Sequence, residues 1–333
     1  TVPFRPEYIR KRLTPKHTAF LRVAEGCDHA CTFCAIPSFR GKFRSKPWDQ
    51  VLQEAKLLAA SGVKELNLIA EDTNQYGMDF GSNDPRRLHD LLYALAEIPE
   101  LAWIRLLYCY PSYFSDELVQ AIKEIPKVVK YIDIPLQHIS DPVLKAMQRP
   151  SKMHTTKILN RLREEIPDIT LRTTFISGFP GETKDDHKEL VKFIKEFKFV
   201  RAGVFGYSEE EGTPAALMQD QFIDEDVKQA RVDELISVQQ NIEETHAKAQ
   251  VGKVMDVIID RIEEGYSIGR TMSDAPEIDS MVHILQQIEP GTILPVRIVG
   301  NHAFDLIGDS NLDAAIIEDD DEEEEEEGII RIA

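Results

Sequence analysis

Three of the four cysteines in this 333-residue chain lie close together, at positions 27, 31 and 34. Three and then two residues separate them, unlike the repeated C-x2-C pairs that close a tetrahedral zinc site. Three thiolates can bind three irons of a [4Fe-4S] cluster and leave the fourth iron without a protein ligand. An open iron can bind a further molecule, so these cysteines predict a cluster that takes part in chemistry.

Two other interpretations of the cysteines stay open. They could form an incomplete zinc site, or they could be small buried side chains, because free cysteine packs well in a core. The neighbouring Asp28, His29 and Thr32 are polar, which suits a loop better than a core strand. We therefore predict that Cys27, Cys31 and Cys34 are metal ligands.

An alternation of strands and helices surrounds this loop. Apolar runs predict strands at 18–25, 63–70, 103–108, 131–136, 169–177 and 200–207. Amphipathic segments predict helices at 47–61, 85–97, 115–125, 141–147, 153–165 and 184–197. This order predicts an α/β fold, a parallel sheet curled into a partial (β/α)6 barrel.

Polar or glycine-rich strings follow the first five predicted strands. Right-handed crossovers place the carboxyl ends of all strands at one mouth, where the catalytic residues of α/β barrels collect. We therefore expect one site at this mouth, built from the cysteine loop, Glu71–Asn74, Tyr110–Ser112, Gln137–His138 and Gly178–Glu182.

The C-terminal part has a different pattern. A long charged helix is expected over 224–250, followed by short apolar runs at 254–260, 266–270, 281–284, 293–299 and 303–307. Five short strands predict a small antiparallel β-barrel. We expect a linker at 1–17, the partial barrel at 18–249, the small barrel at 250–310 and an acidic tail of disordered composition at 311–333.

Composition sets the cellular context. Hydrophobic residues make up 42% of the chain and charged residues 29%, as in ordinary globular proteins. We find no apolar run near the ~20 residues that span a membrane, and no secretory signal. Few cysteines, mostly in a ligand cluster, favour a reducing compartment, the cytoplasm or an organelle stroma. Because the sequence starts at Thr1, we expect a fragment of a longer protein.

The net charge of −19 is only partly due to the acidic run at 318–327. An acidic surface repels nucleic acid and attracts basic proteins, although acidic residues can also serve solubility alone. The segment 252–308 holds nine acidic residues against four basic ones. We therefore expect it to bind a basic protein surface through residues that include Asp274, Glu277 and Asp279.

The cysteine spacing, with Phe33 before the last cysteine, resembles the signature of the radical S-adenosylmethionine (SAM) enzymes. The resemblance implies that SAM chelates the open iron and is cleaved to methionine and a 5′-deoxyadenosyl radical. The chain between about residues 12 and 308 is similar to the methylthiotransferase branch, which joins a radical SAM barrel to a TRAM barrel. The similar strings are L-T-P-K-H (13–17), A-E-G-C (24–27), Y-I-D-I-P-L-Q-H (131–138), L-R-T-T-F-I-S-G-F-P-G-E-T (171–183), F-G-Y-S-E-E-E-G-T-P-A (205–215) and G-R-T-M-S-D-A-P-E-I-D (269–279).

These strings resemble the members that methylthiolate the β-carbon of an aspartate in protein twelve of the small ribosomal subunit. The resemblance implies a basic ribosomal partner, an electron donor such as flavodoxin or ferredoxin, a monomer, and no membrane. A tRNA adenosine methylthiotransferase is the alternative, although L-P-x-Q-S-G-S would then be expected where residues 135–140 stand. A non-catalytic iron-sulfur or zinc protein with Cys109 as fourth ligand is a third possibility, but Cys109 follows an apolar run and is expected in the core.

The resemblance also assigns cofactor-binding residues, with no catalytic side chain beyond the cluster. Three of the assignments have a structural alternative: the acidic string at residues 71–73 could cap a loop, His138 could be a core histidine beside Gln137, and Arg172 could form an interior ion pair. Phe33 and Gln137 are expected in the SAM or substrate pocket and Arg172 at the SAM carboxylate. The methionine amino group would meet Glu71, Asp72 and Thr73, and the nucleoside half would meet Gly178, Gly181 and Glu182.

Members of this family carry an N-terminal domain whose three cysteines hold a second [4Fe-4S] cluster, implicated in sulfur insertion. Only Cys109 remains here beside the cysteine loop. We therefore expect the second cluster only in the full-length protein, and expect this chain to cleave SAM without completing methylthiolation.

Overall fold

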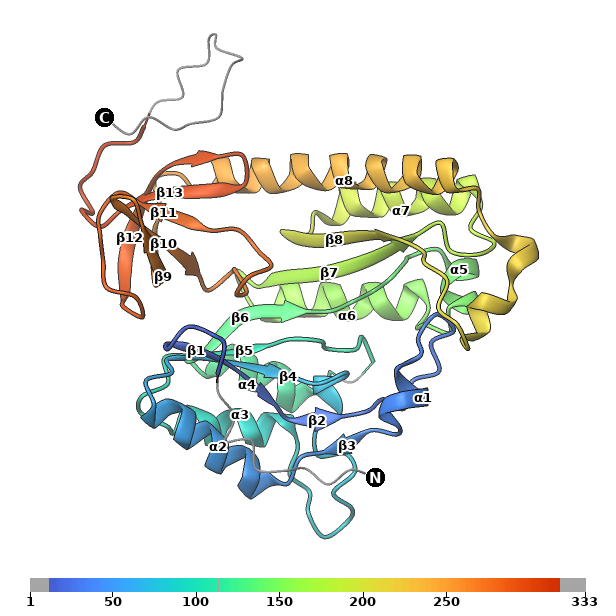
Figure 1. Ribbon diagram of the computed structural model, residues 1–333, viewed down its shortest axis with the longest axis horizontal. Helices are drawn as coiled ribbons and strands as arrows, with labels where there is room; N and C mark the ends of the chain where they lie inside the picture. The colour runs from blue at the N-terminus through green and yellow to red at the C-terminus, as the bar shows by residue number, and fades with distance from the viewer. Residues whose placement is uncertain (1–11, 113, 318–333) are drawn as a thin grey trace.

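The computed structural model describes residues 12–112 and 114–317, and its centre is a six-stranded parallel sheet (Figure 1). The strands follow one another across the sheet in chain order, and every neighbouring pair is parallel. The predicted α/β architecture is confirmed. The strands are β1 (Thr18–Arg22), β4 (Glu65–Ile69), β5 (Trp103–Leu106), β6 (Val128–Asp133), β7 (Thr170–Ser177) and β8 (Arg201–Gly206).

Helices connect the strands and bury their apolar sides against the sheet, where one large core forms. Several of them begin at side-chain caps: Ser115 Oγ accepts from Leu118 N, Ser151 Oγ accepts from His154 N, and Thr183 and Asp186 form a reciprocal capping box. The helices are α2 (Trp48–Ala60), α3 (Leu88–Ala96), α4 (Asp116–Glu124), α5 (Asp141–Ala146), α6 (Lys152–Glu165) and α7 (Lys184–Phe197). Among the described residues, we find no helix that combines the length and the hydrophobicity of a membrane span.

Strand β6 differs from its prediction, because it spans Val128–Asp133 rather than 131–136. Val128 and Val129 are buried and extend the strand backwards. Pro135 cannot donate to a β-ladder, and Gln137 has a positive φ of 74°. The chain therefore leaves the sheet where the apolar sequence continues, and Gln137 returns to it by one isolated bridge to Phe175.

A two-stranded sheet holds the cysteine loop. Strands β2 (Ala24–Glu25) and β3 (Arg44–Ser45) pair antiparallel, and the short helix α1 (Ile36–Arg40) lies between them in sequence. Gly26 starts the loop with φ 78°, and a Cβ there would lie 2.3 Å from the Lys42 carbonyl oxygen. Only glycine fits this approach of two backbone segments.

Helix α8 (Glu225–Lys248) runs along the sheet and leads into a closed five-stranded barrel, here called the small barrel. Four of its neighbouring pairs are antiparallel, but β11 and β13 are parallel, unlike the predicted antiparallel barrel. A closed ring with an odd number of strands cannot alternate direction throughout, so one parallel pair is required. The strands are β9 (Val254–Glu263), β10 (Tyr266–Thr271), β11 (Val282–Ile284), β12 (Ile293–His302) and β13 (Asp305–Asp309).

The small barrel lies at the amino ends of the parallel strands, on the far side of the sheet from α1 and α5 (Figure 1). Thr170, the first residue of β7, donates to Ser273 Oγ at 2.9 Å. Arg201, the first residue of β8, donates to Asp274 at 2.6 Å. The opposite, carboxyl edge of the sheet remains for the cysteine loop. Most of the predicted linker at 1–17 and acidic tail at 311–333 lies outside the described residues.

Candidate functional site

The three cysteines lie together at the mouth, which we define as the carboxyl edge of the six-stranded sheet with the loops that follow its strands. All three are partly exposed, and none is in a disulfide. The loop is fastened at its middle: Thr32 Oγ1 donates to Ala146 O at 2.8 Å, and Thr32 O accepts from Ala215 N at 2.9 Å. The end of α5 and the 3-10 helix η3 (Pro214–Leu217) therefore fix its position.

The donor set fits an iron-sulfur cluster, because three cysteine thiolates can each bind a different iron and leave the fourth iron open. Among the described residues, no three His, Cys, Asp or Glu side chains form a group that could hold a single ion. Burial raises the pKa of Cys27 to about 11 and also raises that of Cys34, and the neighbouring thiols add to both shifts. Binding would therefore have to displace these protons.

The acidic string after β4 separates into residues with different surroundings. Asp72 is fully buried and accepts from the Tyr110 amide, and its Oδ2 lies 2.8 Å from His29 Nε2. Thr73 donates to Leu107 O at 2.5 Å and begins the 3-10 helix η2 (Thr73–Gln75). Glu71 is loosely approached by Arg40 at 3.9 Å, and its Oε2 is buried without a hydrogen-bond partner. Glu71 thus keeps an acceptor for a ligand, whereas Asp72 and Thr73 hold the loop.

The string after β6 places Gln137 and His138 beside the loop that follows β7. Gln137 Oε1 is a buried acceptor without a partner. His138 is fully buried, accepts from Ser140 N through Nδ1, and lies 3.7 Å from Glu182 through Nε2. Burial lowers the pKa of His138 to about 3 and raises that of Glu182. His138 is therefore neutral at pH 7 and fits the description of a core histidine.

Glu182 and the two glycines of its loop, Gly178 and Gly181, contact other parts of the chain. Glu182 accepts from Gly178 N at 2.7 Å and from Arg231 on α8 at 2.8 Å. A Cβ at Gly178 would lie 2.4 Å from Lys228, and one at Gly181 would lie 2.8 Å from Gln221. Both glycines have positive φ, so they are needed for the turn and for close packing of the segment 221–228.

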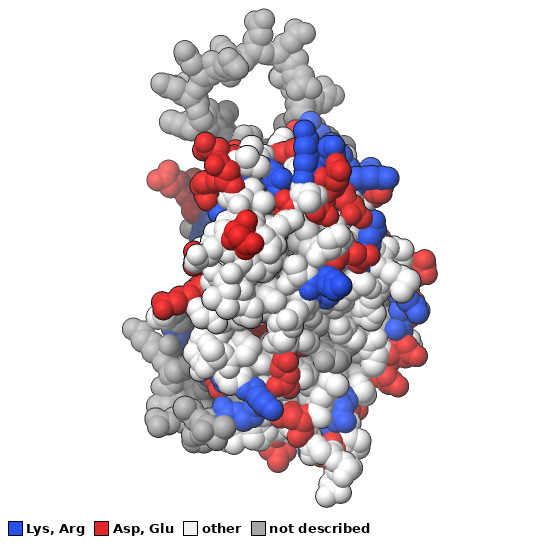
Figure 2. Space-filling model, turned by 90° about the vertical axis from the view of Figure 1, so that its right-hand side faces the viewer, with Lys and Arg blue, Asp and Glu red and all other residues white. Residues whose placement is uncertain are grey.

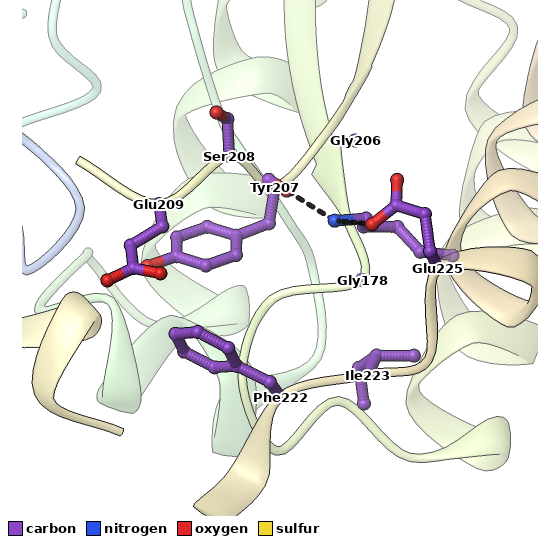
Figure 3. A pocket seen from close by; sticks show the side chains of 9 residues that line it. Gly178, Gly206, Tyr207, Ser208, Glu209, Phe222, Ile223 and Glu225 are labelled. Carbon is purple, nitrogen blue, oxygen red and sulfur yellow. Dashed lines mark hydrogen bonds and ion pairs between the residues drawn. The ribbon is translucent and has the colours of Figure 1, made fainter. Parts of the chain in front are cut away.

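A pocket of about 470 Å³ opens where β7 and β8 end and α8 begins (Figure 3). The rings of Tyr207 and Phe222 lie on one side of it, and Gly178 lies at its back. Lys228 donates to Tyr207 O at 2.8 Å and pairs with Glu225 at 2.7 Å. Phe33 packs nearby, against the apolar cluster that contains Phe179 and Tyr207. Phe33 therefore fixes the cysteine loop onto the end of β7 and the segment after β8.

Arg172 is engaged within the protein. Its Nη1 donates to Asp133 at 2.9 Å, and its Nε lies 3.5 Å from Asp279 of the small barrel. Burial alone would lower the pKa of Arg172, but the two carboxylates hold it above its usual value. This is the interior ion pair that the sequence left open as an alternative.

Sequence reasoning missed a stacked group beside the cysteines. Arg149 Nη1 donates to Cys31 Sγ at 3.6 Å, and its guanidinium lies 4.2 Å from the centroid of the Tyr110 ring. The same ring stacks on His29 at 3.4 Å with an interplanar angle of 11°. His29 and Tyr110 belong to strings noted in the sequence, but nothing in the sequence connects Arg149 to them.

Cys109 follows β5, belongs to the main apolar core and is fully buried. Its amide donates to Asp133 O at 2.8 Å, and burial raises the pKa of its thiol well above the usual value. The burial of Cys109 agrees with the core position expected from the sequence. A role for Cys109 as fourth metal ligand has no support.

The acidic residues of the small barrel are not all available for recognition, which corrects the sequence-based expectation. Asp274 is only 2% exposed and pairs with Arg201. The Asp279 side chain is 3% exposed and accepts from Tyr131 at 2.7 Å. Of the three predicted contact residues, only Glu277 is exposed. The two aspartates fasten the barrel to the sheet, because buried arginines and a tyrosine there require acceptors.

The parallel sheet with three cysteines at its mouth defines a radical SAM protein, and the chain belongs to that superfamily. The radical SAM superfamily model matches residues 21–194, and a TRAM domain model matches residues 251–310. Coproporphyrinogen III oxidase (HemN) from Escherichia coli, described as a radical SAM enzyme, shares the fold with a TM-score of 0.51. The match is 14% identical and covers 72% of this chain and 55% of that one.

Relatives define the family more narrowly. The chain is 46% identical over 304 residues to ribosomal protein uS12 methylthiotransferase RimO from Clostridium perfringens (strain 13 / Type A), covering 91% of this chain and 68% of that protein. It is 45% identical over 304 residues to the protein of that name from Bacteroides thetaiotaomicron, covering 90% and 69%. The chain therefore belongs to the RimO family. It spans about two thirds of the length of the curated relatives it matches.

Proposed function

We propose that this chain is the radical SAM and TRAM part of an enzyme that methylthiolates the β-carbon of an aspartate in ribosomal protein uS12. The observation that carries the proposal is the single loop with Cys27, Cys31 and Cys34 at the mouth of the parallel sheet. The names of the relatives supply methylthiotransfer and the target protein uS12, and the resemblance of the sequence strings supplies the aspartate β-carbon. Membership of the superfamily supplies the cofactors, a [4Fe-4S] cluster and SAM.

In this proposal, the three cysteines hold the cluster, which supplies the one-electron reduction that cleaves SAM when both are bound. Glu71 Oε2 and Gln137 Oε1 are buried acceptors without partners at the mouth. Such atoms are costly unless a donor reaches them, and the SAM ammonium is a donor of suitable chemistry. Glu71 and Gln137 therefore bind and orient SAM, whereas Asp72, Thr73, Gly178, Gly181 and Glu182 shape the loops around it.

The surroundings of the mouth suit a protein substrate. Figure 2 shows the side of the molecule that bears α1, α5 and the start of α8, and its middle has few charged side chains. Several apolar side chains are exposed, among them Phe39, Phe205 and Leu217. A surface with so little positive charge offers few contacts for tRNA phosphates, so this surface does not support the alternative of a tRNA substrate.

The remaining roles belong to the same proposal. The enzyme acts as a monomer where ribosomes are assembled, in the cytoplasm or an organelle stroma, and receives electrons from a flavodoxin or a ferredoxin. A second cluster for sulfur insertion would reside in the part of the relatives that this chain does not span. The chain itself then cleaves SAM without completing methylthiolation.

Iron and sulfide analysis and SAM cleavage under reducing conditions test the proposal. We expect one oxygen-sensitive cluster per chain, and cleavage that Cys34→Ala abolishes and Cys109→Ala leaves largely intact. Zinc in place of iron, or equal loss in both variants, would overturn it. Mass spectrometry of purified small subunits and tRNA, each treated with a full-length version, decides the substrate.

A further inference from the structure

Arg149 makes a direct side-chain contact with a cysteine of the loop. It follows α5, and its Nη1 donates to Cys31 Sγ at 3.6 Å. An N–H group at this distance from sulfur forms a hydrogen bond, and a cationic donor makes such a bond stronger. The contact joins a residue far along the chain to the middle cysteine.

Three features fix the guanidinium in this position. It lies 4.2 Å from the centroid of the Tyr110 ring, within range of a cation–π interaction. Its Nη2 donates to the Pro135 carbonyl oxygen. Tyr110 is itself held by its stack on His29 at 3.4 Å. A side chain held on several sides loses little further freedom when it donates to a ligand.

The donors of Arg149 are not all used. Its Nε is buried and has no hydrogen-bond partner among the described residues. A buried guanidinium N–H without a partner is costly, and an acceptor group in the cysteine loop would relieve that cost. This atom and the sulfur contact both favour a negatively charged group beside Cys31.

We propose that Arg149 tunes the reduction potential of the cluster by donating to Cys31 Sγ when that sulfur binds iron. Hydrogen bonds to ligand sulfurs and nearby positive charge stabilise the more negative, reduced cluster. Arg149 is thus a positioning and tuning residue, and it is not a catalytic one. The inference rests on the proposed function only in requiring that the cysteines hold a cluster.

The test is a redox titration of the reconstituted chain without SAM, followed by electron paramagnetic resonance. Arg149→Gln removes the charge and the fork of donors, and we expect it to make reduction at least tenfold less favourable, a shift of about 59 mV to more negative potential. Arg149→Lys keeps the charge without the fork, and its potential should lie between those of the wild type and Arg149→Gln.

A matched control is Arg163→Gln. Arg163 also lies over an aromatic ring, that of Phe197 at 3.6 Å, and also donates to a carbonyl, but at the end of α6 away from the mouth. We expect a wild-type potential for it. The proposal is overturned if Arg149→Gln, with normal iron content, keeps the wild-type potential and only weakens SAM binding.

Two results separate this inference from the proposed function. If the wild type assembles no [4Fe-4S] cluster, both fail together. If it assembles the cluster and cleaves SAM while the potentials of the Arg149 variants are unchanged, only this inference fails. Should Arg149→Gln not fold, as judged by circular dichroism, the Arg149→Lys potential decides, and a value equal to that of the wild type would reject the tuning role.

Discussion

Arg270 of the small barrel reaches Glu65, the first residue of β4, with Nη2 2.7 Å from Oε2, and neither side chain is more than 3% exposed. Arg105 donates to the same carboxylate from β5 at 3.0 Å. The two arginines outweigh the effect of burial and hold the pKa of Glu65 below its usual value. The small barrel is therefore attached to the sheet by a buried, shared carboxylate.

Glu65→Gln should lower the free energy of unfolding by about 3–5 kcal/mol, because it leaves the buried Arg105 guanidinium without its carboxylate and leaves Arg270 with Asp260 alone. Denaturant titration followed by fluorescence measures the loss. Asp185→Asn, which removes an ion pair with Lys188 on the exposed side of α7, should change stability by less than about 0.5 kcal/mol. Similar losses for both variants would show that the shared carboxylate adds no special stability.

Asp274→Lys should destabilise the chain by about 3–5 kcal/mol, because it places a cation against the buried Arg201. Glu277→Lys adds the same charge three residues later at an exposed position and should leave the melting temperature within about 2 °C. Thermal unfolding compares the two. If Asp274→Lys melts like the wild type and weakens binding of a basic protein, Asp274 would belong to an acidic recognition surface, as first expected from the sequence.

His138 should make the protein less stable as the pH falls from about 6.5 to 5. Its pKa is about 3 in the folded protein and near 6.5 in the unfolded chain, so the unfolded state binds more protons in this range. Above pH 6.5, ionisation of His138 takes nothing from the free energy of unfolding. Below pH 6.5, it lowers the free energy of unfolding by about 1.4 kcal/mol per pH unit. Burial raises the pKa of Glu182, so its protonation favours the folded state and opposes this trend at the acidic end of the range.

Unfolding free energies of His138→Asn and wild type, measured at several pH values in that range, check the assignment. For His138→Asn, the slope of unfolding free energy against pH should be smaller by the equivalent of about one bound proton. His302→Asn, at an exposed position, should keep the wild-type slope. Identical slopes for wild type and His138→Asn would mean that another group is responsible.

Glu71→Gln and Asp72→Asn should affect different properties. Glu71 keeps an acceptor for the SAM ammonium, so its loss should weaken SAM binding to the cluster-loaded chain about tenfold with little change in stability. Asp72 is buried and already bonded to His29 and Tyr110, so Asp72→Asn should cost about 1–3 kcal/mol of stability. Calorimetric SAM titration and thermal unfolding separate the two effects. If Asp72→Asn weakens SAM binding as much as Glu71→Gln does, Asp72 would also be a SAM-binding residue.

The sequence by itself determined the architecture and the position of the cysteine loop. Alternating apolar runs and amphipathic helices follow from local periodicity, and right-handed crossovers then leave only one edge for the loops after the strands. The position of Cys109 in the core followed in the same way from an apolar run. These features depend on neighbouring residues and general rules of packing, so they need no knowledge of distant contacts.

Only the tertiary structure decided which polar residues are already used. Glu71 and Asp72 are adjacent and chemically alike, yet one keeps a free acceptor and the other is bound by His29 and Tyr110. Arg149 meets Cys31, and Asp274 meets Arg201, across long stretches of chain. Such pairings are set by where whole elements dock, because a buried charge must find its partner in space, and no local pattern records that partner.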